Sequence, residues 1–215
     1  MANHQQKQLQ NNSAFVLGNG TSRLRLNLPE LRGKGTIFGC NALYREFEPD
    51  HLVAVDVKMV NEIIGAGYHK THSVWTNPNK GVSSKTNINF FSPHKGWSSG
   101  PTALWFASQQ GYKNIYIFGF DYQGHDGKFN NVYADTFNYK KSSDAATFFG
   151  NWLSQTEKTI TEHKHINYYK VGAAGSFIPE KLRNFVNLKH ITFEEFDQIF
   201  NKTVYHDRTD QKTTI

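Results

Sequence analysis

The sequence has very little cysteine and no long apolar run. Cys40 is the single cysteine, so the chain cannot hold an internal disulfide and offers no thiolate cluster for zinc. No apolar run approaches the roughly 20 residues of a transmembrane helix. The first twelve residues, MANHQQKQLQNN, lack the apolar core of a signal peptide. We therefore expect a cytoplasmic protein without a transmembrane segment, and we expect no metal site.

Basic residues outnumber acidic ones, yet the sequence has no long basic block. The chain carries 24 Lys and Arg against 18 Asp and Glu, which gives a formal net charge of +6. Such a surface attracts phosphates, whether in nucleotides, nucleic acid or membranes. Because the charges are scattered, nucleic-acid binding remains possible but has little support from the charge balance alone.

The length and composition indicate one folded domain. The 215 residues are 38% hydrophobic and 14% aromatic, which suits a chain with one sizeable core. We predict a single domain over residues 13–205. The Gln- and Asn-rich residues 1–12 are predicted to be a disordered tail, and residues 206–215 a polar tail.

Short apolar runs alternate with helical patterns along this domain. Strands are predicted over residues 14–18, 35–41, 51–56, 73–78, 88–92, 113–121 and 166–171. Helices are predicted over residues 57–69, 99–112, 142–163 and 192–200, with Ser99 and Thr192 as N-caps. The alternation predicts an α/β fold: a single Rossmann-like, doubly wound, mostly parallel sheet with helices on both faces.

A glycine-rich loop follows the first predicted strand. The stretch SAFVLGNGTSR places Gly18, Asn19, Gly20 and Thr21 directly after an apolar run. Glycine lets a ligand approach the backbone, and successive free N–H groups can bind an anion. The spacing matches neither the P-loop nor the G-x-G-x-x-G motif. A tight turn without a ligand is the alternative interpretation of this loop.

Polar residues also follow the other predicted strands. In a parallel sheet these ends share one edge, where α/β proteins bind ligands. A nucleotide needs hydrogen-bond acceptors for its base and ribose beside donors for its phosphate. The predicted nucleotide-binding residues are Gly18, Asn19, Gly20, Thr21, Asn41, Asp56, Ser99, Gly100 and Asp121.

Three stretches of the chain carry a family resemblance. FVLGNGTSR, IFGCNALY and SSGPTALWFASQQGYKNIYIFGFDY resemble, in order and spacing, the motifs of bacterial CMP-sialic-acid-dependent lipooligosaccharide sialyltransferases. The resemblance covers roughly residues 14–150. It implies a Rossmann-like glycosyltransferase that binds a nucleotide sugar, most simply a CMP-sugar, and inverts the anomeric centre without a required cofactor or metal. The acceptor is not implied.

The resemblance also assigns roles to single residues. It places Asn19 and Asn41 against the nucleotide, with Ser99 and Gly100 near its base or phosphate. Asp121 would contact the ribose and phosphate together with Tyr122. Tyr133 is the counterpart of a tyrosine that assists phosphate departure.

The sequence departs from the family at the general base. The family has a histidine before the next helix, whereas this chain has Tyr139, Lys140 and Lys141 there. A tyrosine with a pKa of about 10 is a poor base at neutral pH. His125 and Asp126, in the glycine-rich loop after Asp121, are the nearest replacements. The candidate catalytic residues are therefore Tyr122, Tyr133, Tyr139, His125 and Asp126.

Two alternatives stay open. The chain has a weaker resemblance to archaeal-type 6-hydroxymethylpterin diphosphokinase-like proteins, which would make Asp56 and Asp121 ligands of Mg²⁺ with a triphosphate. A catalytically inactive nucleotide- or nucleic-acid-binding scaffold would explain the missing histidine.

Overall fold

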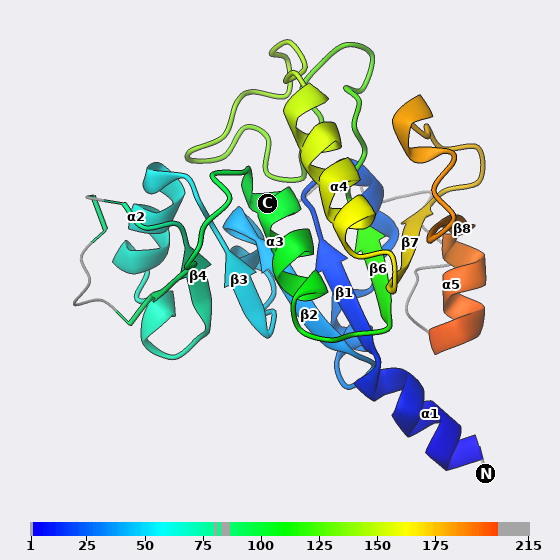
Figure 1. Ribbon diagram of the computed structural model, residues 1–215. Coiled ribbons are helices and arrows are strands. Elements are labelled where there is room, and N and C mark those ends of the chain that lie inside the picture. Colours follow the sequence, from blue (N-terminus) through cyan, green and yellow to red (C-terminus); the bar gives the residue numbers. More distant parts are fainter. Residues whose placement is uncertain (1, 80, 83–86, 202–215) are drawn as a thin grey trace.

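A single eight-stranded sheet forms the centre of the protein (Figure 1). The structure is a computed structural model that describes residues 2–79, 81–82 and 87–201. The strands are β1 (Ser13–Leu17), β2 (Thr36–Cys40), β3 (His51–Val53), β4 (Val74–Thr76), β5 (Asn89–Phe90), β6 (Asn114–Phe118), β7 (Asn167–Gly172) and β8 (Leu188–Thr192). Their order is β5-β4-β3-β2-β1-β6-β7-β8, and each neighbouring pair is parallel.

Helices cover both faces of the sheet (Figure 1). The helices are α1 (Ala2–Asn11), which extends away from the end of the sheet (Figure 1), α2 (Val57–Gly65), α3 (Ser99–Ser108), α4 (Gly150–Glu162) and α5 (Phe193–Phe200), with the 3₁₀ helices η1 (Thr21–Arg25), η2 (Leu28–Leu31), η3 (Asn41–Arg45), η4 (Tyr68–Lys70) and η5 (Glu180–Leu182). Side chains alternate along each strand. Ala14 and Val16 of β1 therefore pack in the core below α3 and α4, whereas Phe15 and Leu17 pack with α2 and α5.

The order in which the chain adds strands to the sheet changes direction between β1 and β6. From β1 it builds strand after strand outward to β5, then returns to add β6, β7 and β8 on the other side of β1. This is the topological switch point, where the loops beyond β1 and β6 separate and leave a crevice. The predicted doubly wound Rossmann-like fold is confirmed.

Several elements differ from the sequence-based expectation. Helix α1 forms where residues 1–12 were expected to be a disordered tail, because Ala, Gln and Lys favour a helix and Leu9 packs against the core. Strand β8 was not anticipated. The polar tail predicted over residues 206–215 lies outside the described residues.

Two helix starts also differ. Helix α4 begins at Gly150 and not at residue 142. Residues 142–149 instead belong to a long loop, in which the N–H of Ser142 donates to Asp135 Oδ1. Ser98, not Ser99, is the residue before α3. Thr192 caps α5 through a capping box with Glu195, as expected.

None of the helices among the described residues combines the length and the apolar character that crossing a membrane requires. The cytoplasmic location stays a prediction.

Candidate functional site

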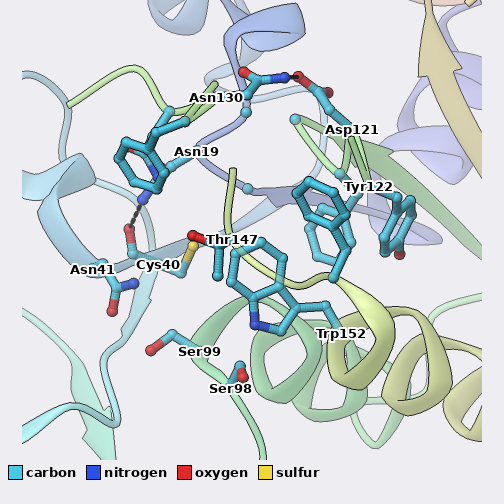
Figure 2. Close-up of a pocket in the computed structure, with 18 of the residues that line it drawn as sticks. Asn19, Cys40, Asn41, Ser98, Ser99, Asp121, Tyr122, Asn130, Thr147 and Trp152 are labelled. Atoms are coloured by element: carbon cyan, nitrogen blue, oxygen red, sulfur yellow. Dashed lines mark hydrogen bonds between the residues drawn. The ribbon is translucent and has the colours of Figure 1, made fainter. Parts of the chain in front are cut away.

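A cavity of about 370 Å³ opens at the switch point, beyond the carboxyl ends of the central strands. Figure 2 shows Asn19, Cys40 and Asn41 on one side of it and Tyr122 with Trp152 on the other, with Ser98 and Ser99 at the start of α3. The long loop between β6 and α4 supplies Phe129, Asn130, Tyr139 and Thr147. The cavity is therefore built from parts of the chain that are far apart in sequence.

Most of the predicted nucleotide-binding residues line this cavity. Those that do are Gly18, Asn19, Gly20, Asn41, Asp56, Ser99, Gly100 and Asp121. Thr21 lies outside it and lines a second cavity. The structure thus brings the strand ends together as the parallel-sheet argument expects, while the role of each residue stays a prediction.

The glycines of the first loop are needed by the fold itself. A Cβ atom on Gly18 would lie 2.6 Å from the carbonyl oxygen of Gly119, and one on Gly119 would lie 2.6 Å from the carbonyl oxygen of Gly18. The N–H groups of Gly18 and Gly20 donate to the carbonyl oxygens of Phe118 (2.8 Å) and Gly119 (2.9 Å). The loops after β1 and β6 therefore cross in direct contact, and these two N–H groups are not free to bind an anion.

The carboxylate of Asp121 connects the loops after β1 and β6 through hydrogen bonds. Its oxygens accept the Ser22 hydroxyl, the Ser22 N–H at 3.1 Å and the Asn130 Nδ2 at 3.1 Å. Asn130 Oδ1 in turn accepts the N–H and the hydroxyl of Thr21, at 2.9 and 2.7 Å. Asp121 consequently holds the cavity wall together.

Two amide oxygens at the cavity are left without a partner. Asn19 donates its Nδ2 to the carbonyl oxygen of Cys40 at 3.1 Å. The Oδ1 atoms of Asn19 and Asn41 are buried and accept no hydrogen bond from the described part of the chain. An unsatisfied buried acceptor costs about 1–3 kcal/mol. A ligand that reached these oxygens with a hydrogen-bond donor would satisfy them.

Helix α3 points its N-terminus into the cavity. Ser98, Ser99, Gly100 and Pro101 all line it. The Ser99 hydroxyl accepts the N–H of Val55 at 3.1 Å, so it joins α3 to the end of β3 and does not cap the helix. The N-terminus of a helix carries a positive partial charge of about +0.5 and binds anions.

The candidate tyrosines differ in their access to the cavity. Tyr122 lines it, but its hydroxyl donates to Thr156 Oγ1 on α4 at 2.8 Å. Tyr139 also lines it, and its hydroxyl accepts the N–H of Ala42 at 3.4 Å. Burial raises the pKa of both hydroxyls. Both tyrosines are therefore hydrogen-bond donors at neutral pH and poor bases.

Tyr133 does not line the cavity. It is buried next to Tyr139, with ring centroids 5.6 Å apart. Its hydroxyl donates to Glu46 Oε1 at 2.5 Å and accepts from Arg23 Nη2 at 3.1 Å. Arg23 is itself buried and pairs with Glu46 at 2.8 Å. In this arrangement Tyr133 stabilises a buried charge pair.

The predicted replacements for the histidine base also lie elsewhere. His125 and Asp126 are exposed, pair with each other at 3.2 Å and line the second cavity. No histidine of the described ranges lines the first cavity, where Asp56 and Asp121 are the carboxylates. Asp56 is exposed, and its carboxylate makes no hydrogen bond or ion pair with the residues the structure describes.

The sequence reasoning missed the aromatic wall of the cavity. Phe149 and Trp152 line it, with ring centroids 6.0 Å apart. Residues 142–163 were predicted to be one amphipathic helix, in which aromatic side chains are expected to face the core. The sequence Phe-Asn-Asn, residues 129–131, follows the glycine-rich loop after Asp121 and also lines the cavity. An aromatic residue beside two amides was the signal that could have added these residues to the predicted site.

The described residues of this cavity give little support to the Mg²⁺-dependent diphosphokinase-like alternative. Among residues 2–79, 81–82 and 87–201 no group of three or more His, Cys, Asp or Glu is placed to hold a metal ion. Asp121, one of the two carboxylates needed, already has both oxygens occupied by N–H and O–H donors.

The fold is similar to that of solved sialyltransferases. No family model and no curated protein matches the sequence. The monofunctional alpha-2,3-sialyltransferase Cst-I from Campylobacter jejuni is 14% identical with a TM-score of 0.56, covering 95% of this chain and 88% of that one. The sialyltransferase CstII from Campylobacter jejuni, in complex with cytidine-5'-monophosphate, is 16% identical with a TM-score of 0.51, covering 83% and 85%. The likeness confirms a distant resemblance in fold to these enzymes.

Proposed function

We propose that this protein is a glycosyltransferase-like enzyme that binds a CMP-sugar in the first cavity and transfers the sugar to an acceptor. The observation that carries the proposal is the cavity's chemistry: two unpartnered amide oxygens lie at one wall and a helix N-terminus at another. A nucleotide is a donor of hydrogen bonds at its base and ribose and an anion at its phosphate. The fold shared with a sialyltransferase in complex with CMP supports the same ligand.

The proposed placement follows from matching donors to acceptors. The amino group of the base or the ribose hydroxyls donate to Oδ1 of Asn19 and Asn41. The phosphate lies at the N-terminus of α3, near Ser99 and Gly100. The ring of Trp152 stacks on the base or the sugar.

The proposed chemistry uses two further cavity residues. Tyr139 stays protonated because burial raises its pKa, so it can donate to the phosphate as negative charge grows there. No residue that the structure describes bonds to the carboxylate of Asp56 at the cavity, whereas the oxygens of Asp121 are occupied. Asp56 is therefore the group that takes the proton from the attacking acceptor hydroxyl, in place of the family's histidine.

Calorimetric titration with CMP and AMP tests the nucleotide site. We expect CMP to bind more tightly, and we expect Asn41→Gly to weaken CMP binding about tenfold, since one hydrogen bond is worth about 1–1.5 kcal/mol. Asn41 has a φ of 52°, so glycine fits its backbone. Asn201→Gly is the matched control, because Asn201 has a φ of 56° and lies outside the cavity.

Equal affinities for CMP and AMP, or an equal loss in both variants, would refute the proposed nucleotide site. If CMP binds but a CMP-sugar is never turned over, the inactive-scaffold alternative is correct. The likeness to sialyltransferases gives nucleic-acid binding no support.

A further inference from the structure

A second cavity of about 580 Å³ lies beyond the carboxyl ends of β6 and β7. It shares Asp121, Gln123 and Asn130 with the first cavity, so these residues form the wall between the two. Its other lining residues come from η1, from the loop after β6, from β7 and the loop that follows it, and from the start of α5. The proposed function assigns nothing to this space.

Lys170 lines the second cavity from strand β7. Lys170 is only 8% exposed. Within the described ranges, its ammonium group makes no hydrogen bond and no ion pair. Burial lowers the pKa of Lys170, and the attraction of Asp121 acts in the opposite direction. A largely buried ammonium without a partner is unfavourable, because it has lost most of its water and gained no anion.

The other charged groups at this cavity already have partners. Arg25 pairs with Glu194 at 2.8 Å. His125 and Asp126 pair with each other at the surface. The carboxylate of Asp121 accepts three hydrogen bonds from neighbouring loops, as described above. The charge of Lys170 is thus the one left uncompensated among the charged side chains of the described residues that line this cavity.

His190 is the titratable neighbour of Lys170 on the next strand. The β7–β8 register places Lys170 opposite His190. The Nε2 of His190 lies 3.2 Å from the carbonyl oxygen of Leu182. Burial lowers the pKa of His190, and the charge of Lys170 lowers it further. A neutral imidazole does not compensate the lysine charge, so an anion from outside remains the missing partner.

We infer that the second cavity binds a sugar that carries a carboxylate or a phosphate, with its anionic group against Lys170. The cavity wall offers hydrogen-bonding groups for sugar hydroxyls, among them Gln123 and the Ser176 hydroxyl. Phe177, which is 43% exposed, provides an apolar surface for a sugar ring. A cation, polar side chains and an exposed aromatic ring together match an acidic sugar better than a free inorganic anion.

Three matched probes test this inference by calorimetry: glucuronate, glucose 6-phosphate and glucose. We expect at least one acidic sugar to bind at least tenfold more tightly than glucose. Binding of the carboxylate but not the phosphate, or the reverse, identifies the anionic group. Equal binding of all three probes, or binding of none, overturns the inference.

Variants then assign the binding to Lys170. Lys170→Met should remove at least tenfold of the acidic-sugar affinity, and Lys170→Arg should retain part of it. Lys189→Met is the control, because Lys189 is an exposed lysine on the adjacent β8. Urea unfolding checks that each variant is folded. If Lys170→Met and Lys189→Met bind acidic sugars equally well, the inference is wrong.

CMP titration of the same variants separates this inference from the proposed function. Lys170 does not line the first cavity, so Lys170→Met should bind CMP as the wild type does. A failure of acidic-sugar binding with normal CMP binding overturns only the second site. A failure of CMP binding in the wild type overturns only the first.

Discussion

Replacing glycines one at a time by alanine tests the crossing of the loops after β1 and β6. Three glycines present different combinations of backbone strain and steric overlap. Gly111 has a φ of +84°, and a Cβ there would meet nothing within 4 Å. Gly20 has a φ of −65°, but its Cβ would lie 2.5 Å from Asp121 Cγ and 2.7 Å from the carbonyl oxygen of Gly119. Gly119 combines both, with a φ of +66° and backbone atoms of Gly18 at 2.6 and 2.8 Å.

The magnitudes follow from these two effects. A left-handed φ costs an alanine about 1–2 kcal/mol, of which about 0.4–1 is offset by the lower entropy of the unfolded chain. Overpacking costs about 1–3 kcal/mol. We therefore expect losses in the free energy of unfolding of about 1 kcal/mol for Gly111→Ala, about 1–2 for Gly20→Ala and about 2–4 for Gly119→Ala.

Urea denaturation measures these losses as shifts in the transition midpoint at constant slope. The decisive comparison is Gly119→Ala against Gly111→Ala, since both positions have a left-handed φ and only Gly119 adds the steric overlap. Equal losses in these two variants would show that the loops do not touch at Gly18 and Gly119. Gly20→Ala should also weaken CMP binding, because it displaces the Asp121 carboxylate from Ser22 and Asn130.

Two further predictions concern the chemistry of the first cavity. Asp56→Asn should reduce the rate of sugar transfer by a factor of about 10²–10⁴ at unchanged CMP affinity, measured by acceptor glycosylation and calorimetry, and an unchanged rate would exclude Asp56 as the base. EDTA should leave CMP binding nearly unchanged in the same titration, whereas a large loss of affinity would favour the Mg²⁺-dependent diphosphokinase-like alternative.

The meeting of the strand ends at one cavity could be predicted because it depends on topology. Asn41, Asp56 and Asp121 are far apart in sequence, yet each follows a buried strand, and parallel strands end at one edge of the sheet. The structural role of the glycines in the loops after β1 and β6 could not be predicted in the same way. Gly18 is required by the approach of Gly119, about a hundred residues away in sequence, and no local pattern reports such a contact.

Side-chain partners explain the remaining differences. Tyr133 matches a family motif by spacing, but Arg23 and Glu46 bind its hydroxyl because a buried guanidinium must be paired. The start of α4 was misplaced because residues 142–149 contain good helix-capping side chains. One of them, Asp144, instead accepts the N–H of Lys141 and helps to hold a loop.

The sheet order also decides how the two cavities are related. Asp56 follows β3, whereas Lys170 lies on β7, and β2, β1 and β6 separate these strands. Four strand spacings of about 4.8 Å place the two side chains about 19 Å apart across the sheet. An acidic sugar held by Lys170 is therefore too far from Asp56 to be the acceptor that Asp56 deprotonates. Under the proposed function, glucuronate and glucose 6-phosphate should therefore not compete with the acceptor in a transfer assay.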